Sequence, residues 1–177
     1  TVTKHSGLSI KNFGVFGSLL HGFYHVKFSD IDLVIYSREN AAKLREALQD
    51  LYRDRTSSLR NEFESDESIR GKSWKFQNYS PKEFVEHQKR KMIYSVFYDK
   101  SSKRTLKVEF EPVKEWNEID SEYEEIRPVI WEGWVKAVAI VKDDKEGAFM
   151  PSVYQIEIVE LMEGPEAIDI RRIICYV

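Results

Sequence analysis

Apolar and polar positions follow two different patterns in the first 115 residues. Residues 12–16 and 31–36 are short apolar runs bounded by glycine or polar residues, which predicts two strands. Residues 38–55 instead repeat apolar side chains every three or four positions, which predicts an amphipathic helix packed on a sheet. The apolar members of this repeat are Ala41, Leu44, Leu48 and Leu51.

A second helix and a hairpin are predicted further along. Ser80 suits a helix N-cap, Pro81 the first helical position and Glu83 the closing position of a capping box, so a helix is expected to run to about Lys91. Residues 92–99 and 105–113 are rich in β-branched and aromatic side chains and flank a polar stretch, which predicts a β-hairpin.

The polar residues 56–75 show no clear period and predict a loop or short helices. If this segment covers a site, its cations are candidates for binding a triphosphate or a nucleic-acid backbone. A solvated surface is the preferred interpretation. The cations are Arg60, Arg70, Lys72 and Lys75.

After residue 115 the character changes to an acidic linker followed by β-rich segments. We place a boundary near Glu125, with one domain at 1–125 and a small β-rich domain at 126–177. The second is expected to form an open antiparallel sheet or a partial barrel. Three strands bury little surface alone, so it is expected to pack on the first domain or to form a homo-oligomer. Trp131 and Trp134 are candidates for that interface or for the core.

Composition restricts the class of protein but does not indicate a function. The 177 residues are 42% hydrophobic and 32% charged, as expected of a globular protein. The 27 basic and 30 acidic residues provide no global attraction to nucleic acid. No stretch approaches the ~20 apolar residues that span a bilayer. The N-terminus lacks a signal-peptide core and an initiator Met, which predicts a trimmed start, and the lone Cys175 fits a reducing cytoplasm.

The clearest chemical signal is a pair of aspartates at the second predicted strand. Side chains alternate along a strand, so Asp30 and Asp32 are expected on one face, about 6 to 7 Å apart, with Ile31 and Leu33 on the other. Two carboxylates present hard oxygen ligands suited to Mg²⁺. Upstream, Gly17 allows close backbone approach, and Ser18 offers donors for phosphate oxygens.

A second acidic face is predicted on residues 105–113. Alternation places Leu106, Val108 and Phe110 on one face of this strand, and it places Lys107, Glu109 and Glu111 on the other. A solvent-facing strand whose charges discourage edge pairing explains the same pattern.

The spacing of glycines and acids resembles the signature of the nucleotidyltransferase superfamily, which includes DNA polymerase β, the CCA-adding enzymes and small archaeal predicted nucleotidyltransferases. The matching residues are Gly17, Ser18, Gly22, Ser29, Asp30 and Asp32. The resemblance covers roughly the first 115 residues, and it implies an α/β (α+β) fold with a mixed sheet flanked by helices. Many members carry arginine or another polar residue after the Gly-Ser, where this chain has Leu19, Leu20 and His21.

The resemblance also implies roles for particular residues. Asp30 and Asp32 would be catalytic and bind Mg²⁺ or Mn²⁺, together with a third carboxylate, for which Glu109 looks equivalent and Glu111 is the fallback. Members usually have aspartate at that position. Gly17, Ser18 and Ser29 would bind the nucleoside triphosphate.

The implied reaction is nucleotidyl transfer to a hydroxyl acceptor with release of pyrophosphate. The superfamily's acceptors include RNA and DNA ends, protein side chains and small antibiotics, and the sequence does not choose among them. Three alternatives stay open. The first is a degenerate nucleotide- or RNA-binding protein of the same fold. The second is a structural interaction protein. The third is that the two aspartates belong to an ordinary hairpin without a chemical role.

Overall fold

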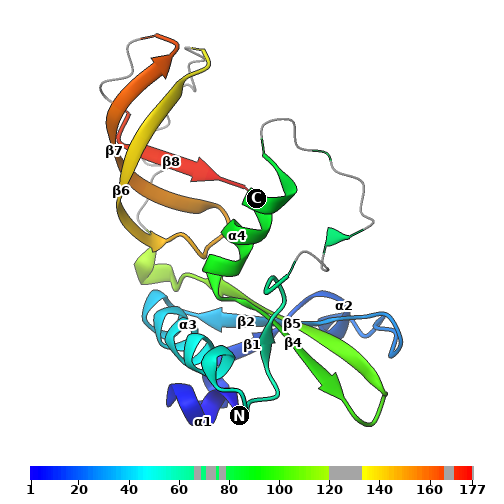
Figure 1. Cartoon of the computed structure of the whole chain (residues 1–177). Coiled ribbons are helices and arrows are strands. Elements are labelled where there is room, and N and C mark those ends of the chain that lie inside the picture. The colour runs from blue at the N-terminus through cyan, green and yellow to red at the C-terminus, as the bar shows by residue number, and fades with distance from the viewer. Residues whose placement is uncertain (66–68, 71–74, 76–78, 120–132, 166–169, 177) are drawn as a thin grey trace. The chain divides into compact units, whose positions relative to one another are not determined.

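The computed structural model describes residues 1–65, 69–70, 75, 79–119, 133–165 and 170–176 (Figure 1). These residues form two compact units, Thr1–Val113 and Lys114–Val177. The predicted boundary near Glu125 and the predicted role of Trp131 lie outside the described residues, so both stay predictions.

A five-stranded mixed sheet organises the first unit. In chain order its strands are β1 (Phe13–Val15), β2 (Ile31–Tyr36), β3 (Arg60–Asn61), β4 (Tyr94–Asp99) and β5 (Arg104–Val113). Their spatial order is β1-β2-β5-β4-β3, in which only β2 and β5 run parallel. The β4–β5 pair is the predicted hairpin. The predicted mixed α+β fold is thereby confirmed.

Helices flank this sheet on both sides. They are α1 (Val2–Ser6), α2 (Gly17–Leu20), α3 (Arg38–Arg53) and α4 (Pro81–Lys91), with a 3₁₀ turn at Ile10–Asn12. Figure 1 shows α1 and α3 on one side of the sheet and α4 on the other. The sequence pattern predicts α3 and α4. It treats Gly17-Ser18 as a tight turn, whereas the structure begins the four-residue helix α2 there.

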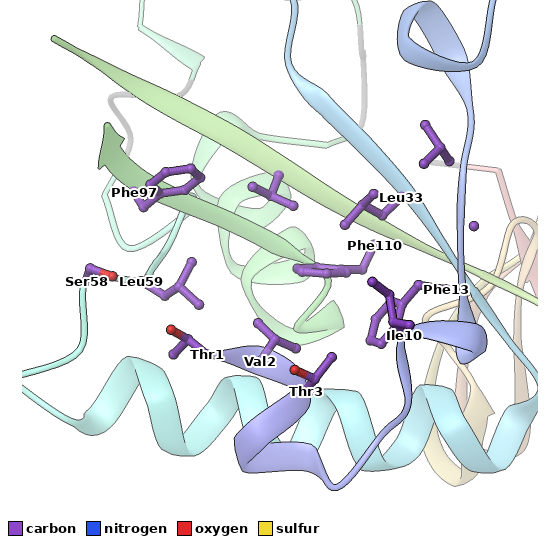
Figure 2. Close-up of a pocket in the computed structure, with 13 residues that line it drawn as sticks. Thr1, Val2, Thr3, Ile10, Phe13, Leu33, Ser58, Leu59, Phe97 and Phe110 are labelled. Atoms are coloured by element: carbon purple, nitrogen blue, oxygen red, sulfur yellow. The ribbon is translucent and has the colours of Figure 1, made fainter. Parts of the chain in front are cut away.

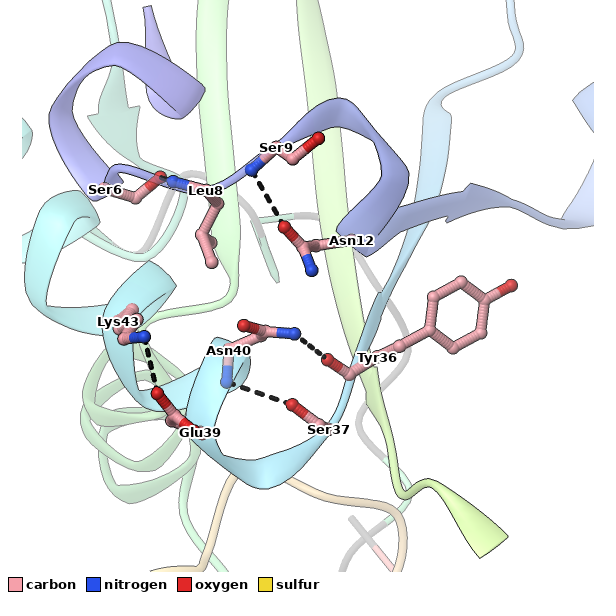
Figure 3. A network of polar contacts seen from close by, with 9 residues as sticks. All are labelled: Ser6, Leu8, Ser9, Asn12, Tyr36, Ser37, Glu39, Asn40 and Lys43. Atoms are coloured by element: carbon pink, nitrogen blue, oxygen red, sulfur yellow. Dashed lines mark hydrogen bonds and ion pairs between the residues drawn. The ribbon is translucent and has the colours of Figure 1, made fainter.

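The junction between β2 and α3 is fixed by local hydrogen bonds (Figure 3). Ser37 adopts φ 76° and its side chain accepts a hydrogen bond from the Asn40 backbone N–H at 3.2 Å. The Asn40 side chain donates to the Tyr36 carbonyl at 2.8 Å. The first bond satisfies an N–H that a helix start leaves unpaired, and the second ties the first turn of α3 to the last residue of β2.

Helix α4 is capped at both ends. Ser80 and Glu83 form the predicted capping box. At the other end, Arg45 of α3 donates through Nε to the Lys91 carbonyl at 2.9 Å. A cation at a helix C-terminus is favoured by the helix dipole. The end of α4 is therefore tied to α3 just before β4 begins.

The main apolar core lies between α3 and the sheet. The predicted stripe is confirmed, because Ala41, Leu44, Leu48 and Leu51 are buried together with Ala47. Val108 and Phe110 of β5 are buried, and Leu33 of β2 lies beside them around an apolar cavity of about 550 Å³ (Figure 2). The apolar face predicted for each strand is therefore the face that α1 and α3 cover.

The second unit is an open antiparallel sheet in the residues that the structure describes. Its strands are β6 (Lys136–Glu146), β7 (Ser152–Glu163) and β8 (Arg172–Cys175), with β7 in the centre. Of the two predicted forms, the open sheet is the one observed. Trp134 is 80% exposed, so it does not belong to this unit's core. No helix in the described ranges is long and apolar enough to span a membrane.

Leu48 tests the packing of α3, because its side chain is fully buried. Leu48→Ala is expected to lower the free energy of unfolding by about 2–5 kcal/mol, since it leaves a cavity beneath the sheet. Urea denaturation followed by circular dichroism measures the loss. Gln49→Ala, on the exposed side of the same helix turn, is the control and is expected to change stability by less than about 0.5 kcal/mol. Equal effects of the two substitutions would contradict this packing.

Candidate functional site

The parallel pairing of β2 with β5 places Asp32 opposite Glu109. The two residues are register partners, as are Val34 and Glu111 two residues further along the strands. Neighbouring strands lie roughly 4.8 Å apart, and register partners project to the same face. The two acidic strand faces predicted from sequence are therefore one continuous surface.

We define the acidic face as Asp32, Glu62, Glu109 and Glu111. Glu62 follows β3, and Lys107 of β5 forms an ion pair with it. Because Glu109 and Glu111 lie on the face of β5 opposite Val108 and Phe110, the acidic face is on the side of the sheet away from the apolar cavity. Both glutamates are only partly accessible to solvent.

The carboxyl of Glu109 is the most perturbed group of this face. Its pKa is raised to about 7, first by burial and then, in decreasing order, by the negative charges of Glu111, Asp32 and Glu62. The pKa of Asp32 is raised by burial and then by Asp30. Burial also raises the pKa of Glu111. The carboxylates of the acidic face therefore repel one another when they are ionised, and binding of a proton or a cation reduces this repulsion.

Lys91 is the main cation acting on these glutamates. Its side chain is only 3% exposed at the end of α4, and its charge lowers the pKa of both Glu109 and Glu111. This attraction only partly offsets the upward shifts. The sequence pattern marks Lys91 only as the end of a helix, because the tertiary contact between α4 and β5 has no local signal.

Asp30 stands slightly apart from the acidic face. It precedes the first residue of β2 and is exposed, whereas Asp32 is half-buried. The two are near enough for Asp30 to raise the pKa of Asp32. Among the described residues, no group of three His, Cys, Asp or Glu side chains is already arranged to hold a metal ion. Repulsion among unneutralised carboxylates favours such separation.

Gly17 lies directly against Asp32. The Phe16 N–H donates to the Asp32 carbonyl at 3.2 Å, and Gly17 has φ +60°. A Cβ on Gly17 would stand 2.3 Å from Asp32 Oδ2, far inside van der Waals contact. Only glycine fits without displacing the carboxylate. The structure thus brings together Gly17, Ser18 at the start of α2, and Asp32.

Ser29 has a structural role in the loop before Asp30. Its hydroxyl accepts a hydrogen bond from the His25 N–H at 2.8 Å. Its carbonyl accepts from Arg104 Nη2 at 2.6 Å, and Arg104 Nη1 also donates to the Lys27 carbonyl at 3.1 Å. The sequence offered no signal for Arg104, because its partners lie more than 70 residues away.

The predicted phosphate-binding cations are only partly described. Arg60 donates to the Ser57 carbonyl at 2.6 Å and the Leu59 carbonyl at 2.7 Å, so its guanidinium stabilises its own loop. Lys72 lies outside the described residues. For Arg70 and Lys75 the predicted role stays a prediction.

Comparison with known proteins decides the family. A sequence model of a protein family, described as the nucleotidyltransferase domain, matches residues 2–129. The chain belongs to the nucleotidyltransferase domain family. This confirms the resemblance that the sequence motif indicated.

The chain is also similar to an uncharacterized protein of the archaeon Methanocaldococcus jannaschii. The two are 32% identical over 157 residues, which are 88% of this chain and 43% of the relative. The chain therefore spans less than half of that relative's length. No solved structure gives a significant match.

The raised pKa of Glu109 predicts a pH-dependent stability. The unfolded glutamate titrates near its ordinary value of 4.5 and the folded one at about 7, so the folded state binds more protons between these values. The contribution of Glu109 to stability is therefore full below pH 4.5 and is lost as the pH rises through 7. Glu109→Gln is expected to lose this part of the pH dependence and to be more stable than wild type at pH 8 without divalent cations. Identical urea midpoints of the two proteins from pH 4.5 to 8 would contradict it.

Gly17 and Gly22 form a matched pair for testing the close approach to Asp32. Both have positive φ, but a Cβ at Gly22 has no neighbour within 4 Å. Each Gly→Ala substitution is expected to cost about 1–2 kcal/mol of unfolding free energy for its backbone conformation. Gly17→Ala is expected to cost more because it also displaces Asp32. Thermal unfolding compares them, and an equal loss of stability would exclude the predicted clash.

Proposed function

We propose that the chain transfers a nucleoside monophosphate from a nucleoside triphosphate to a hydroxyl acceptor. The acceptor oxygen forms a bond to the α-phosphorus, and the bond from that phosphorus to the oxygen bridging to the β-phosphate breaks. Pyrophosphate leaves, and the hydroxyl proton passes to a base. The observation that carries this proposal is the pairing of Asp32 with Glu109 inside a nucleotidyltransferase domain.

The donor set suits a divalent cation, Mg²⁺ or Mn²⁺. Carboxylate oxygens are the ligands such ions prefer, and the pKa values of Asp32 and Glu109 are raised partly by neighbouring negative charge. Asp30, Asp32 and Glu109 would hold the ion. When bound, it would neutralise charge on the attacking and leaving oxygens.

The chain's own groups would position the substrate. Gly17 and Ser18 lie beside Asp32, where backbone N–H groups and the Ser18 hydroxyl would orient phosphate oxygens. Glu109, as a ligand of the ion opposite Asp32, would also help to activate the acceptor hydroxyl.

The second candidate is a nucleotide-binding protein of the same fold without turnover. It is favoured by one observation, that Glu109 stands where members of the superfamily usually have aspartate as the third carboxylate. Such a protein would bind nucleoside triphosphate and transfer nothing.

A transfer assay with each α-labelled nucleoside triphosphate, Mg²⁺ or Mn²⁺, and pooled RNA and protein tests the proposal. Wild type is expected to label an acceptor, and Asp32→Asn and Glu109→Gln are each expected to lower the rate by about 100-fold or more, because charge stabilisation is lost. Glu111→Gln tests the fallback carboxylate and is expected to have a smaller effect. Glu46→Gln, exposed on α3, is the control for removing a charge.

Two results contradict the proposal in different ways. Full activity of Asp32→Asn would exclude the assigned site. Absence of transfer by wild type, together with intact nucleotide binding, would favour the second candidate.

A further inference from the structure

The loop between α2 and β2 carries a dense group of exposed aromatic rings. We call residues 21–28 the aromatic loop, in which five of eight side chains are rings: His21, Phe23, Tyr24, His25 and Phe28. Phe23 is 71% exposed, Tyr24 52% and Phe28 78%. Side chains of this kind gathered on one short surface segment are typical of a binding surface.

The backbone of the aromatic loop is held in place although its rings face solvent. Arg104 binds the carbonyls of Lys27 and Ser29. Within the loop, the Phe28 N–H donates to the His25 carbonyl at 2.9 Å, and the Ser29 hydroxyl accepts from the His25 N–H at 2.8 Å. The rings are therefore presented by an ordered loop, which reduces the entropy lost when a ligand binds.

Both ends of the aromatic loop lie at the candidate site. It begins at His21, immediately after helix α2, whose first residue, Gly17, contacts Asp32. It ends two residues before Asp30. A ligand on the rings would thus lie near the phosphate and carboxylate positions.

The ring geometry and the charge of this segment favour a planar, anionic ligand. The rings of His21 and Phe23 are parallel within 2° at 5.8 Å, and those of His25 and Phe28 are 26° from parallel at 4.7 Å. No Asp or Glu occurs between Gly17 and Ser29, whereas Lys27 lies among the rings. Nucleotides combine a flat base that stacks on aromatic rings with a phosphate that attracts cations.

We propose that the aromatic loop is a platform on which a nucleobase stacks during the reaction. The base belongs either to the nucleoside triphosphate or to a single-stranded nucleic-acid acceptor. This inference rests on the proposed function for its role in transfer, and the binding it describes is measurable without transfer.

Paired substitutions of Phe23 and Phe28 test the platform. Phe23→Leu/Phe28→Leu keeps apolar bulk and removes the rings, whereas Phe23→Tyr/Phe28→Tyr is the matched control that keeps them. One arm measures binding of a fluorescein-labelled oligoadenylate of eight nucleotides by anisotropy. The other measures binding of each unlabelled nucleoside triphosphate with Mg²⁺ by calorimetry. Circular dichroism and the Tm check that the substitutions at these two exposed positions leave the fold unchanged.

The leucine variant is expected to bind one of the two probes about 5- to 150-fold more weakly, and the tyrosine variant is expected to bind like wild type. The arm that responds identifies the source of the base. Wild-type affinity of the leucine variant for both probes would overturn the proposal and indicate an apolar protein-docking surface instead. Failure of wild type to bind either probe would overturn it as well.

The transfer assay separates this inference from the proposed function. If wild type binds a probe more tightly than the leucine variant but shows no transfer, the platform is supported and the enzymatic role is contradicted. Transfer that is lost in Asp32→Asn but unchanged in the leucine variant, with unchanged affinities, retains the enzyme and overturns the platform.

Discussion

The parallel pairing of β2 with β5 is the constraint on which the candidate site depends. It joins strands more than 70 residues apart and sets Asp32 opposite Glu109. The same register places Leu33 and Phe110 on the other face, where α1 and α3 cover them. One set of backbone hydrogen bonds therefore supports both the apolar core and the charged surface. A slip of one residue would exchange the two faces.

Concentrated negative charge is the functional consequence of that register. A partly buried carboxyl beside three others is destabilising in its ionised form, and the charge of Lys91 only partly offsets this cost. The folded state is therefore expected to be most stable when a proton or a divalent cation is bound to the acidic face. Gly17 matters for the same reason, since only a residue without a Cβ leaves Asp32 in place.

Local sequence patterns predicted the elements well and their assembly less well. The period of α3, the Ser80–Glu83 cap and the alternation in β5 depend on neighbouring residues, so they are visible in the sequence. The roles of Lys91 and Arg104 depend on distant contacts and have no such signal. The aromatic loop was not predicted as a site, because the exposure of its rings is known only from the structure.

The most direct test of this account is the titration of Glu109 itself. A ¹³C NMR pH titration of its side-chain carboxyl, assigned by comparison with Glu109→Gln, reports whether the acidic face exists as described. The account predicts a pKa of about 7 in cation-free buffer and a clear decrease when Mg²⁺ and a nucleoside triphosphate are added. An ordinary glutamate pKa, or one that Mg²⁺ and nucleotide leave unchanged, would contradict it.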